Sequence, residues 1–310
     1  MEGVLRGDVR SIARAISLVE DDRAEARELL AALFPCAGHA LVLGVTGPPG
    51  AGKSSLVDRL AAHLRAQGRT VGIVAVDPTS PYSGGAILGD RIRMNAHATD
   101  EGVFIRSMAT RGHLGGLAAA TGHVITILSA SGKDVVLVET VGVGQDEVDV
   151  VGAADVSVVV LVPGLGDEVQ ALKAGIMEIA DVFVVNKADR DGVEKLVAEI
   201  EAMLSFAGDA GEAPRIVKTV ATEDRGTGEL LEAVLAFHRE AEASGALARR
   251  RRARLRRQLE TAVRQRVMAH VRARVLSPAE LEETVGRMAD RVVDPETAAD
   301  EIVGRMGLLP

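Results

Sequence analysis

The sequence predicts an α/β fold in which a doubly wound, mostly parallel sheet carries helices on both faces. Short runs rich in Val, Ile and Leu alternate with longer segments of helical periodicity, which is the pattern of strand–helix–strand units. Aromatic residues make up only 2% of the 310 residues, so the core must be aliphatic, as it is where helices pack on a parallel sheet. We expect an N-terminal helical extension at 1–37, the α/β domain at 38–243 and a C-terminal helical arm at 244–310.

The expected elements follow from periodicity and from boundary residues. Residues 1–34 carry apolar side chains at mixed spacings of three and four, and Pro35 ends this helical segment. The predicted strands are 41–45, 71–76, 103–105, 135–138, 156–162, 182–185 and 215–220. The predicted helices between them are 53–67, 116–130, 167–180, 192–205 and 227–240. After the last predicted strand the pattern is helical only. One helix is predicted over 246–275, and helical structure continues over 278–306 after the helix-start signal Ser277-Pro278.

The first predicted strand is followed by a glycine-rich loop and then by a helix. The loop reads Gly47-Pro48-Pro49-Gly50-Ala51-Gly52-Lys53-Ser54, which matches the P-loop pattern G-x-x-x-x-G-K-S. Its glycines let backbone N–H groups point at phosphate oxygens, and the helix N-terminus faces the same anion. Lys53 is expected to reach the β- and γ-phosphates, and the Ser54 hydroxyl to hold Mg²⁺. We predict a nucleoside triphosphate site made by this loop and Ser55.

A second motif, Asn186-Lys187-Ala188-Asp189, follows the predicted strand 182–185 and matches N-K-x-D. The Asp189 carboxylate can accept two hydrogen bonds from guanine, from N1–H and the exocyclic amine, and adenine offers no such pair. The wrong base leaves the carboxylate unpaired, which is costly. Asn186 is expected at purine N7 and the Lys187 stem over the base plane. Behind a P-loop, this motif favours GTP over ATP.

Carboxylates near the ends of predicted strands are candidates for catalysis and for the Mg²⁺ shell. Glu139 follows strand 135–138, and the N–H of Gly142 can meet the γ-phosphate. Asp77 follows strand 71–76, and Asp90 precedes a helical pattern, where a plain N-cap is the alternative. Either aspartate could complete the Mg²⁺ shell or polarise water. The predicted catalytic residues are Lys53, Asp77, Asp90 and Glu139, and the predicted metal ligands are Ser54, Asp77, Asp90 and Glu139.

The residue after Gly142 is Val143, at the position where Ras-like enzymes carry the glutamine that orients water. A valine cannot position a nucleophile, so we expect slow intrinsic hydrolysis. Gln145 could substitute only if the loop rearranges, and a solvated loop residue is an equally good interpretation.

Composition limits the disulfides and metal sites that the chain can form, and it indicates the cellular compartment. Cys36 is the only cysteine, which excludes internal disulfides and multi-cysteine metal sites and favours a reducing cytoplasm. The His residues show no ligand spacing, so we expect no metal besides Mg²⁺. The N-terminus lacks the apolar core of a signal peptide, and no apolar run approaches the ~20 residues of a membrane helix. We expect a cytoplasmic protein without a membrane partner.

The net charge is −8, yet positive charge is concentrated near the C-terminus. Residues 245–275 hold eleven Arg and one Glu, and seven of the nine residues of 249–257 are Arg. Such a run can attract the phosphates of nucleic acid or of an anionic membrane, but without aromatic residues it offers no stacking platform. We favour a solvated helix face that docks on the acidic remainder of a dimer, and we expect no nucleic-acid partner.

Several strings of this sequence together resemble one family. They are Gly47–Ser54, Asp77-Pro78-Thr79-Ser80, Gly84–Arg91, Glu139–Gln145 and Asn186–Asp189. With them the sequence resembles the methylmalonyl-CoA mutase-associated GTPases, the MeaB/ArgK family, along nearly the whole chain. The D-P-T-S and E-T-V-G-V-G-Q strings are far more specific than the P-loop.

The resemblance implies a homodimeric GTPase that cycles between GTP and GDP with Mg²⁺ and escorts an adenosylcobalamin-dependent acyl-CoA mutase. Such proteins gate cofactor loading and protect the mutase from inactivation, while the mutase stimulates GTP hydrolysis. The C-terminal helices of the family dimerise, which would be the role of 246–306 here.

The resemblance also implies roles for two further stretches. Asp167, Gln170 and Lys173 match a segment that couples the nucleotide to the partner, although these residues alone favour a capped, solvated helix. The loop Val220-Ala221-Thr222 would close over guanine, with Thr222 where the family often has a small residue.

Two other function classes stay open on the sequence. A GTPase that delivers nickel or zinc to a metalloenzyme is disfavoured because Cys/His clusters are absent from the sequence. A kinase linked to amino-acid transport would need a phosphoacceptor, and N-K-x-D disfavours ATP.

Overall fold

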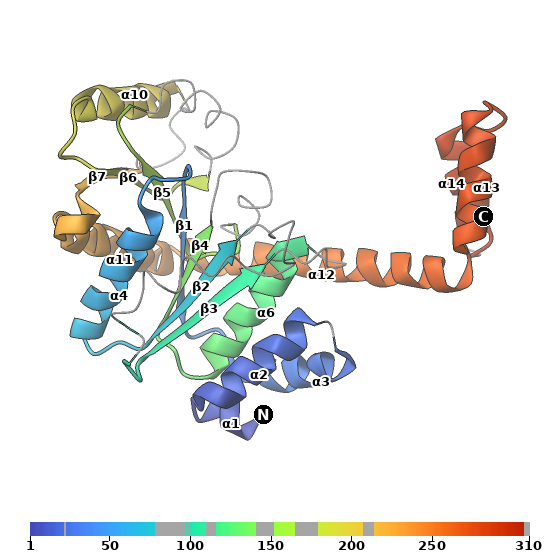
Figure 1. The fold of residues 1–310 in the computed structure, drawn as a ribbon, viewed down its shortest axis with the longest axis horizontal. Helices are drawn as coiled ribbons and strands as arrows, with labels where there is room; N and C mark the ends of the chain where they lie inside the picture. The colour runs from blue at the N-terminus through green and yellow to red at the C-terminus, as the bar shows by residue number, and fades with distance from the viewer. Residues whose placement is uncertain are drawn as a thin grey trace. The chain divides into compact units, whose positions relative to one another are not determined.

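Among the residues that the structure describes, seven strands form one parallel sheet in the order β3-β2-β4-β1-β5-β6-β7 (Figure 1). The structure is a computed structural model that describes residues 1–21, 23–77, 97, 99–109, 116–140, 152–164, 179–206 and 214–306, with side chains except at 77, 109, 116–119 and 206. The chain divides into two compact units, Met1–Arg254 and Leu255–Pro310, and the sheet belongs to the first. The strands are β1 (Leu41–Thr46), β2 (Val71–Asp77), β3 (Val103–Ala109), β4 (Val135–Thr140), β5 (Val156–Leu161), β6 (Val182–Asn186) and β7 (Arg215–Thr219).

The path of the chain through the sheet reverses direction at β1. The chain runs from β1 to β2 and β3, returns to β4 beside β1, and then builds β5, β6 and β7 on the other side. All six strand pairs are parallel, which confirms the predicted doubly wound α/β class. Ligands of such sheets bind at the carboxyl ends of the strands, next to the point of reversal. The loop after β1 lies at that point.

Aliphatic helices cover both faces of the sheet. On one face, α4 (Lys53–Ala66) and α11 (Thr227–Ala243) pack on alternate strand residues, and Leu56, Leu60 and Leu64 of α4 are fully buried there. On the other face, α2 (Val9–Glu20), α3 (Ala24–Leu33) and α6 (Gly116–Ala130) share a core with Val42, while α10 (Val193–Phe206) packs on β5 and β6. Strands buried on both faces explain the nearly continuous apolar runs of the sequence.

Two stretches that were each predicted as one continuous helical segment are divided into separate helices. The predicted helical segment 1–34 consists of α1 (Glu2–Leu5), α2 and α3, because the Asp8 carboxylate accepts the Ser11 N–H at 2.8 Å and starts a new helix. The predicted stretch 278–306 is two helices, α13 (Pro278–Ala289) and α14 (Pro295–Gly304). Here Asp294 caps the N–H groups of Glu296 and Thr297, so Asp294-Pro295 is a second start signal that sequence reasoning missed. Of the predicted helix 167–180, all but the last two residues lie outside the described residues.

The last helices belong wholly or partly to the second unit. From Leu255 onward, α12 (Ala246–Arg274) exposes apolar side chains, with Leu259 65% and Val263 52% exposed. Val271, by contrast, is buried. Ion pairs join α13 to α14, Arg287 to Glu301 at 3.1 Å and Arg305 to Glu280 at 3.0 Å. No described helix has both the length and the apolarity needed to cross a bilayer.

Part of the arginine run binds buried carboxylates of the first unit, which corrects the expectation of a solvated face. Asp155, just before β5, is 1% exposed and contacts both Arg251, at 2.6 Å, and Arg254, at 3.5 Å. Asp181, just before β6, contacts Arg250 at 2.8 Å. Burial raises the pKa of Asp181, and Arg250 opposes this shift. These pairs hold the start of α12 against the amino ends of the strands.

Replacing Arg251 by Ala is expected to lower the free energy of unfolding by about 2–3 kcal/mol, because it leaves the buried Asp155 carboxylate with a weaker partner. Urea unfolding of the full chain measures this change. Arg252→Ala is the matched control, since Arg252 is exposed on the same helix. An equal loss of stability in both variants would contradict a structural role for the Asp155 pair.

Candidate functional site

The loop after β1 has the backbone conformation that its glycines require. Gly47, Gly50 and Gly52 have φ values of +145°, +74° and +88°, in the left-handed region that side chains rarely adopt. A Cβ atom on Gly47 would lie 2.1 Å from the carbonyl oxygen of Val160, and one on Gly52 would lie 2.4 Å from Asn186 Nδ2. The loop therefore passes too close to the β5 backbone for any other residue at position 47, and the positive φ of Gly52 disfavours another residue at position 52.

Lys53 is the cation of this loop. It is the first residue of α4 and is 5% exposed. Its Nζ donates to the carbonyl oxygens of Gly47 at 2.8 Å and Pro48 at 2.9 Å, so the side chain folds back over the loop. A buried ammonium beside a helix N-terminus is placed to meet an anion such as a triphosphate.

Two of the four predicted metal ligands are in contact. Ser54 Oγ donates to Glu139 Oε1 at 2.6 Å, and Glu139 is buried at the end of β4. The register of β4 beside β1 pairs Val45 with Glu139, which brings the carboxylate next to the loop. Hydroxyl and carboxylate oxygens are the hard donors that Mg²⁺ prefers, so this pair fits the ion.

The remaining predicted catalytic and metal residues are only partly described. The Asp77 backbone ends β2 and pairs with Ala109 of β3, and β2 also lies beside β4. Its side chain, like all of Asp90, lies outside the described residues. So do Gly142, Val143 and Gln145, together with the predicted partner-coupling residues Asp167, Gln170 and Lys173.

Asn186 connects the loop 47–54, called the phosphate loop from here on, to the predicted base-closing loop 220–222. It is 2% exposed, and its Nδ2 donates to the Ala51 carbonyl oxygen at 2.8 Å. Its Oδ1 accepts from Thr219 Oγ at 3.0 Å and from the Ala221 N–H at 3.2 Å. The amide has a second N–H, which none of the described contacts uses. Thr219 was not predicted, because nothing in the local sequence shows that β7 pairs with β6.

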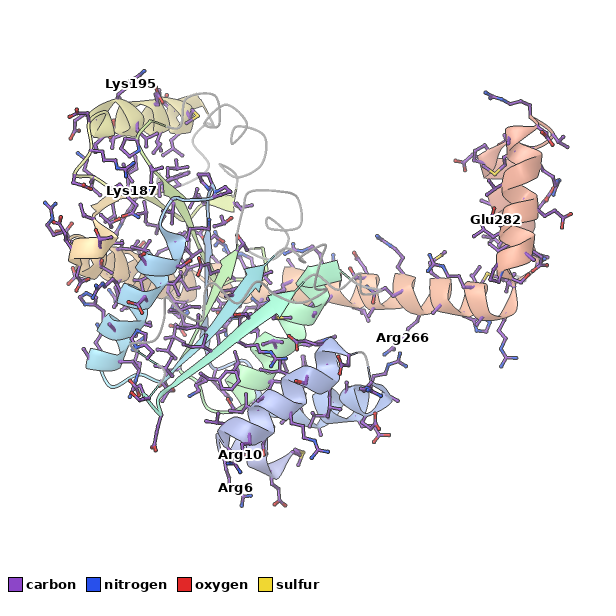
Figure 2. All side chains as sticks on the ribbon, viewed as in Figure 1. Arg6, Arg10, Lys187, Lys195, Arg266 and Glu282 are labelled. Carbon is purple, nitrogen blue, oxygen red and sulfur yellow. The ribbon has the colours of Figure 1, made fainter. Side chains whose placement is uncertain are left out.

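The rest of the N-K-x-D motif directly follows β6. Lys187, labelled in Figure 2, has φ +57°; its Nζ donates to the Gly50 carbonyl oxygen at 2.7 Å. Asp189 is exposed in the turn that follows. The lysine stem thus runs from the motif to the phosphate loop.

The predicted base-closing residues belong to a tight loop after β7. Ala221 and Thr222 lie in the short helix η4 (Ala221–Glu223), and Val220 pairs with Arg225 in an antiparallel bridge. Arg59 of α4 donates to the Ala221 carbonyl oxygen at 3.3 Å. Arg59 is a supporting residue that sequence reasoning missed, because its partner lies 162 residues away.

Comparisons with known proteins agree with this geometry. The family model of the methylmalonyl-CoA mutase-associated GTPase MeaB matches residues 12–275. A putative GTPase of Pyrococcus abyssi is 49% identical over 98% of this chain and 94% of its own length. GTPase ArgK of Escherichia coli is 39% identical over 78% of this chain and 76% of its own length. A crystal structure described as an LAO/AO transport system kinase matches with a TM-score of 0.73 and 28% identity, covering 99% of this chain and 96% of that one. The chain belongs to the MeaB family of GTPases, as its motifs indicate.

Proposed function

We propose that this protein hydrolyses GTP slowly by itself and acts as a chaperone for an adenosylcobalamin-dependent acyl-CoA mutase, gating cofactor loading and protecting the mutase. The proposal that the protein binds a guanine nucleotide is supported mainly by the hydrogen bonds of Asn186. One buried amide bonds both to Ala51 of the phosphate loop and to Ala221 of the loop after β7. A nucleotide that binds both its phosphates and its base would bring the same two loops together.

The residues of the chain have separate roles in hydrolysis. The N–H groups of the loop and the start of α4, together with the Lys53 ammonium, would bind the β- and γ-phosphate oxygens and stabilise the charge that develops there. Ser54 and Glu139 would hold Mg²⁺, which when bound neutralises phosphate charge. Because Val143 cannot orient water, the isolated protein would turn over slowly.

Asp189→Asn is expected to shift the base preference from guanine toward xanthine by about 100-fold or more, since it replaces an acceptor by a donor where xanthine has an extra oxygen. Calorimetry with GDP, XDP and ADP measures the shift. Asp191→Asn, two residues further along the same exposed turn, is the matched control. Equal affinity of the unaltered protein for GDP and ADP would refute the base assignment.

The chaperone part rests on membership of a family whose description names association with methylmalonyl-CoA mutase. The test is co-purification from the source cell, with the tagged protein loaded with GDP or with a non-hydrolysable GTP analogue. We expect an acyl-CoA mutase to be retained in amounts that depend on the nucleotide. Recovery of no mutase with either nucleotide would refute this partner, while leaving the GTPase assignment intact.

The second unit supports the proposal of a homodimer. Its α12 exposes a row of apolar side chains that one helix cannot bury alone, namely Leu255, Leu259, Val263 and Val267. Leu259→Glu with Val263→Glu is expected to weaken dimerisation by about 100-fold, ~2.7 kcal/mol, because carboxylates would have to be buried.

Light scattering over a concentration series measures the dissociation of this dimer. Arg264→Glu is the control, since it changes the net charge by the same two units at another exposed position of α12. A double variant that stays dimeric at the same concentrations as the unaltered protein would show that this row does not form the interface.

Two alternative functions, a kinase and a metal-delivery GTPase, can be tested separately. The first is distinguished by where the γ-phosphate goes, and the second by whether the protein binds nickel or zinc. A kinase would transfer the γ-phosphate of its nucleotide to an acceptor, whereas the proposed GTPase releases inorganic phosphate. A metal-delivery GTPase would bind nickel or zinc tightly, yet no group of three or more His, Cys, Asp or Glu side chains in the described parts of the chain is arranged to hold a metal ion.

A further inference from the structure

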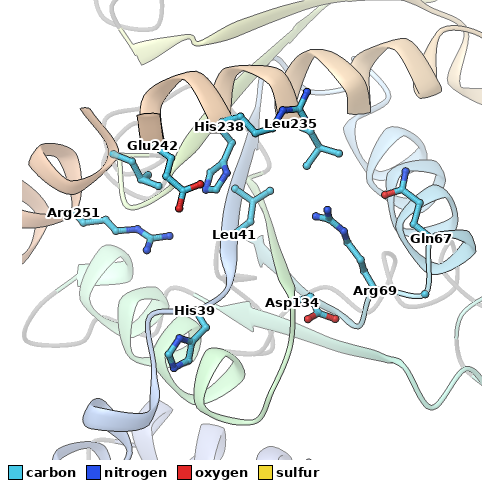
Figure 3. A pocket seen from close by; sticks show the side chains of 12 residues that line it. His39, Leu41, Gln67, Arg69, Asp134, Leu235, His238, Glu242 and Arg251 are labelled. Carbon is cyan, nitrogen blue, oxygen red and sulfur yellow. The ribbon is translucent and has the colours of Figure 1, made fainter. Parts of the chain in front are cut away.

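A cavity of about 590 Å³ lies at the amino ends of the strands, far along the sheet from the phosphate loop (Figure 3). Leu41, the first residue of β1, lines it, whereas the phosphate loop follows the last residue of β1. Gln67 and Arg69, just after α4, line it as well, whereas Lys53 begins that helix. The cavity is therefore separate from the nucleotide site, and its volume suits a small organic molecule.

Three guanidinium groups line this cavity. Arg251 is bound to Asp155, as described above. In the described part of the chain, the guanidinium groups of Arg69 and Arg239 make no hydrogen bond or ion pair, although Arg69 is half-buried. Half-buried guanidinium groups usually have acceptors, because their donors are costly to leave unmatched. Arg69, which is half-buried, and Arg239, which is exposed, thus offer two sets of donors to a ligand.

Two carboxylates also line the cavity, those of Asp134 and Glu242. Asp134 accepts from the N–H of Thr70 at 2.7 Å and from its hydroxyl at 2.8 Å. These bonds lower the pKa of Asp134, and the charge of Arg69 adds to the shift. Glu242 is exposed; the pKa of Arg251 is raised chiefly by its hydrogen bond to Asp155, and the charge of Glu242 adds a smaller contribution.

His238 adds a further polar atom. Its ring lines the cavity, and its Nε2 is buried without a hydrogen-bond partner among the described residues. In Figure 3, His238 extends from α11 and Arg69 from the turn after α4 toward the same space. A buried, unmatched ring nitrogen is unfavourable, and a ligand that takes up its hydrogen bond would relieve this cost.

The cavity also has an apolar side. Leu41 and Leu247 are buried, and Leu235 packs on the same core. From these contacts we propose that the cavity binds a small organic phosphate, with the phosphate between the Arg69 and Arg239 side chains and an apolar body against the leucines. Two guanidinium forks suit the three oxygens and double charge of a phosphate ester better than the two oxygens of a carboxylate.

The test uses the full chain with Mg²⁺ and saturating GDP, so that the phosphate loop is occupied. Phenyl phosphate is titrated by calorimetry, and retention of GDP is measured in the same samples. We expect saturable binding at one site per chain with a Kd below about 1 mM, and at least tenfold weaker binding of benzoate and phenol. Absence of saturable binding, displacement of GDP, or benzoate binding as tight as that of phenyl phosphate would overturn the proposal.

Variants locate the binding in the cavity. Arg69→Gln removes one free guanidinium and is expected to raise the Kd at least tenfold. His238→Phe, which keeps an aromatic ring but removes both ring nitrogens, is expected to raise it severalfold. Arg10→Gln removes an exposed arginine of α2, outside the cavity, and is expected to leave the Kd unchanged. Binding that is equal in Arg69→Gln and the unaltered protein, or equally weak in Arg10→Gln, would overturn the site. The nucleotide assignment would survive either result, since it depends on other residues.

Discussion

Replacing Lys53 by Ala is expected to lower kcat/KM for GTP by about 100- to 1,000-fold, which corresponds to ~2.7–4 kcal/mol of transition-state stabilisation. The Lys53 ammonium is buried in the phosphate loop, within 2.8 Å of the Gly47 carbonyl oxygen. Without it the phosphates lose the only cation that the loop itself contains. Charge that develops on the transferred phosphoryl group would then be stabilised by backbone N–H groups and Mg²⁺ alone.

Steady-state phosphate release over a range of GTP concentrations measures this loss. Lys195→Ala is the matched control, because Lys195 is an exposed lysine of α10 whose only described ion pair, to Glu199, spans 3.9 Å. Thermal unfolding of both variants shows whether each is folded. Turnover at the unaltered rate in a folded Lys53→Ala protein would mean that this loop does not carry out the chemistry.

A partner mutase is expected to raise the rate of GTP hydrolysis at least about tenfold, which corresponds to ~1.4 kcal/mol off the barrier. The reason is Val143, which leaves the isolated chain without a water-orienting side chain at that position. Ras offers a comparison: alone it hydrolyses GTP at about 10⁻⁴ s⁻¹, and its activator adds about 10⁵-fold by supplying further groups that stabilise the transition state. A partner that orders the loops around the phosphates would act in the same way.

Single-turnover hydrolysis with and without the co-purified mutase measures this stimulation. Lys173→Ala is expected to leave the basal rate largely intact and to lower the stimulation, since Lys173 belongs to the proposed coupling segment. Lys195→Ala again serves as control. A fast basal rate that the mutase does not change would contradict the expected stimulation, and an unaltered response of Lys173→Ala would exclude that segment from the coupling.

The sequence predicted the fold class, and it offered candidate site residues, because both have local signatures. Apolar runs with aliphatic composition indicate strands buried on both faces, and all seven described strands overlap predicted ones. The three glycines of the P-loop motif allow the backbone conformation of the loop. The motif could therefore predict that Lys53 and Ser54 lie at the start of the following helix. In the same way, N-K-x-D placed Asn186 at the end of a strand.

The contacts that the sequence could not predict join residues far apart in the chain. Asn186 binds Ala51 and Ala221 only because β6 lies between β5 and β7, and strand order has no local signature. The ion pairs of α12 likewise depend on where this helix meets the sheet. Arg250 binds Asp181 before β6, 69 residues away, and Arg251 binds Asp155 before β5, 96 residues away. Composition alone made that run look like a solvated face.

The central claim is that this chain selects and hydrolyses GTP, and phosphate release from GTP and ATP under identical conditions tests it most directly. Purified full-length protein is incubated with each nucleotide at the same concentration, with Mg²⁺ and then with a chelator. We expect inorganic phosphate from GTP, with at least about a hundredfold less from ATP, and loss of the activity on chelation. Equal release from both nucleotides, or release from ATP alone, would contradict the account.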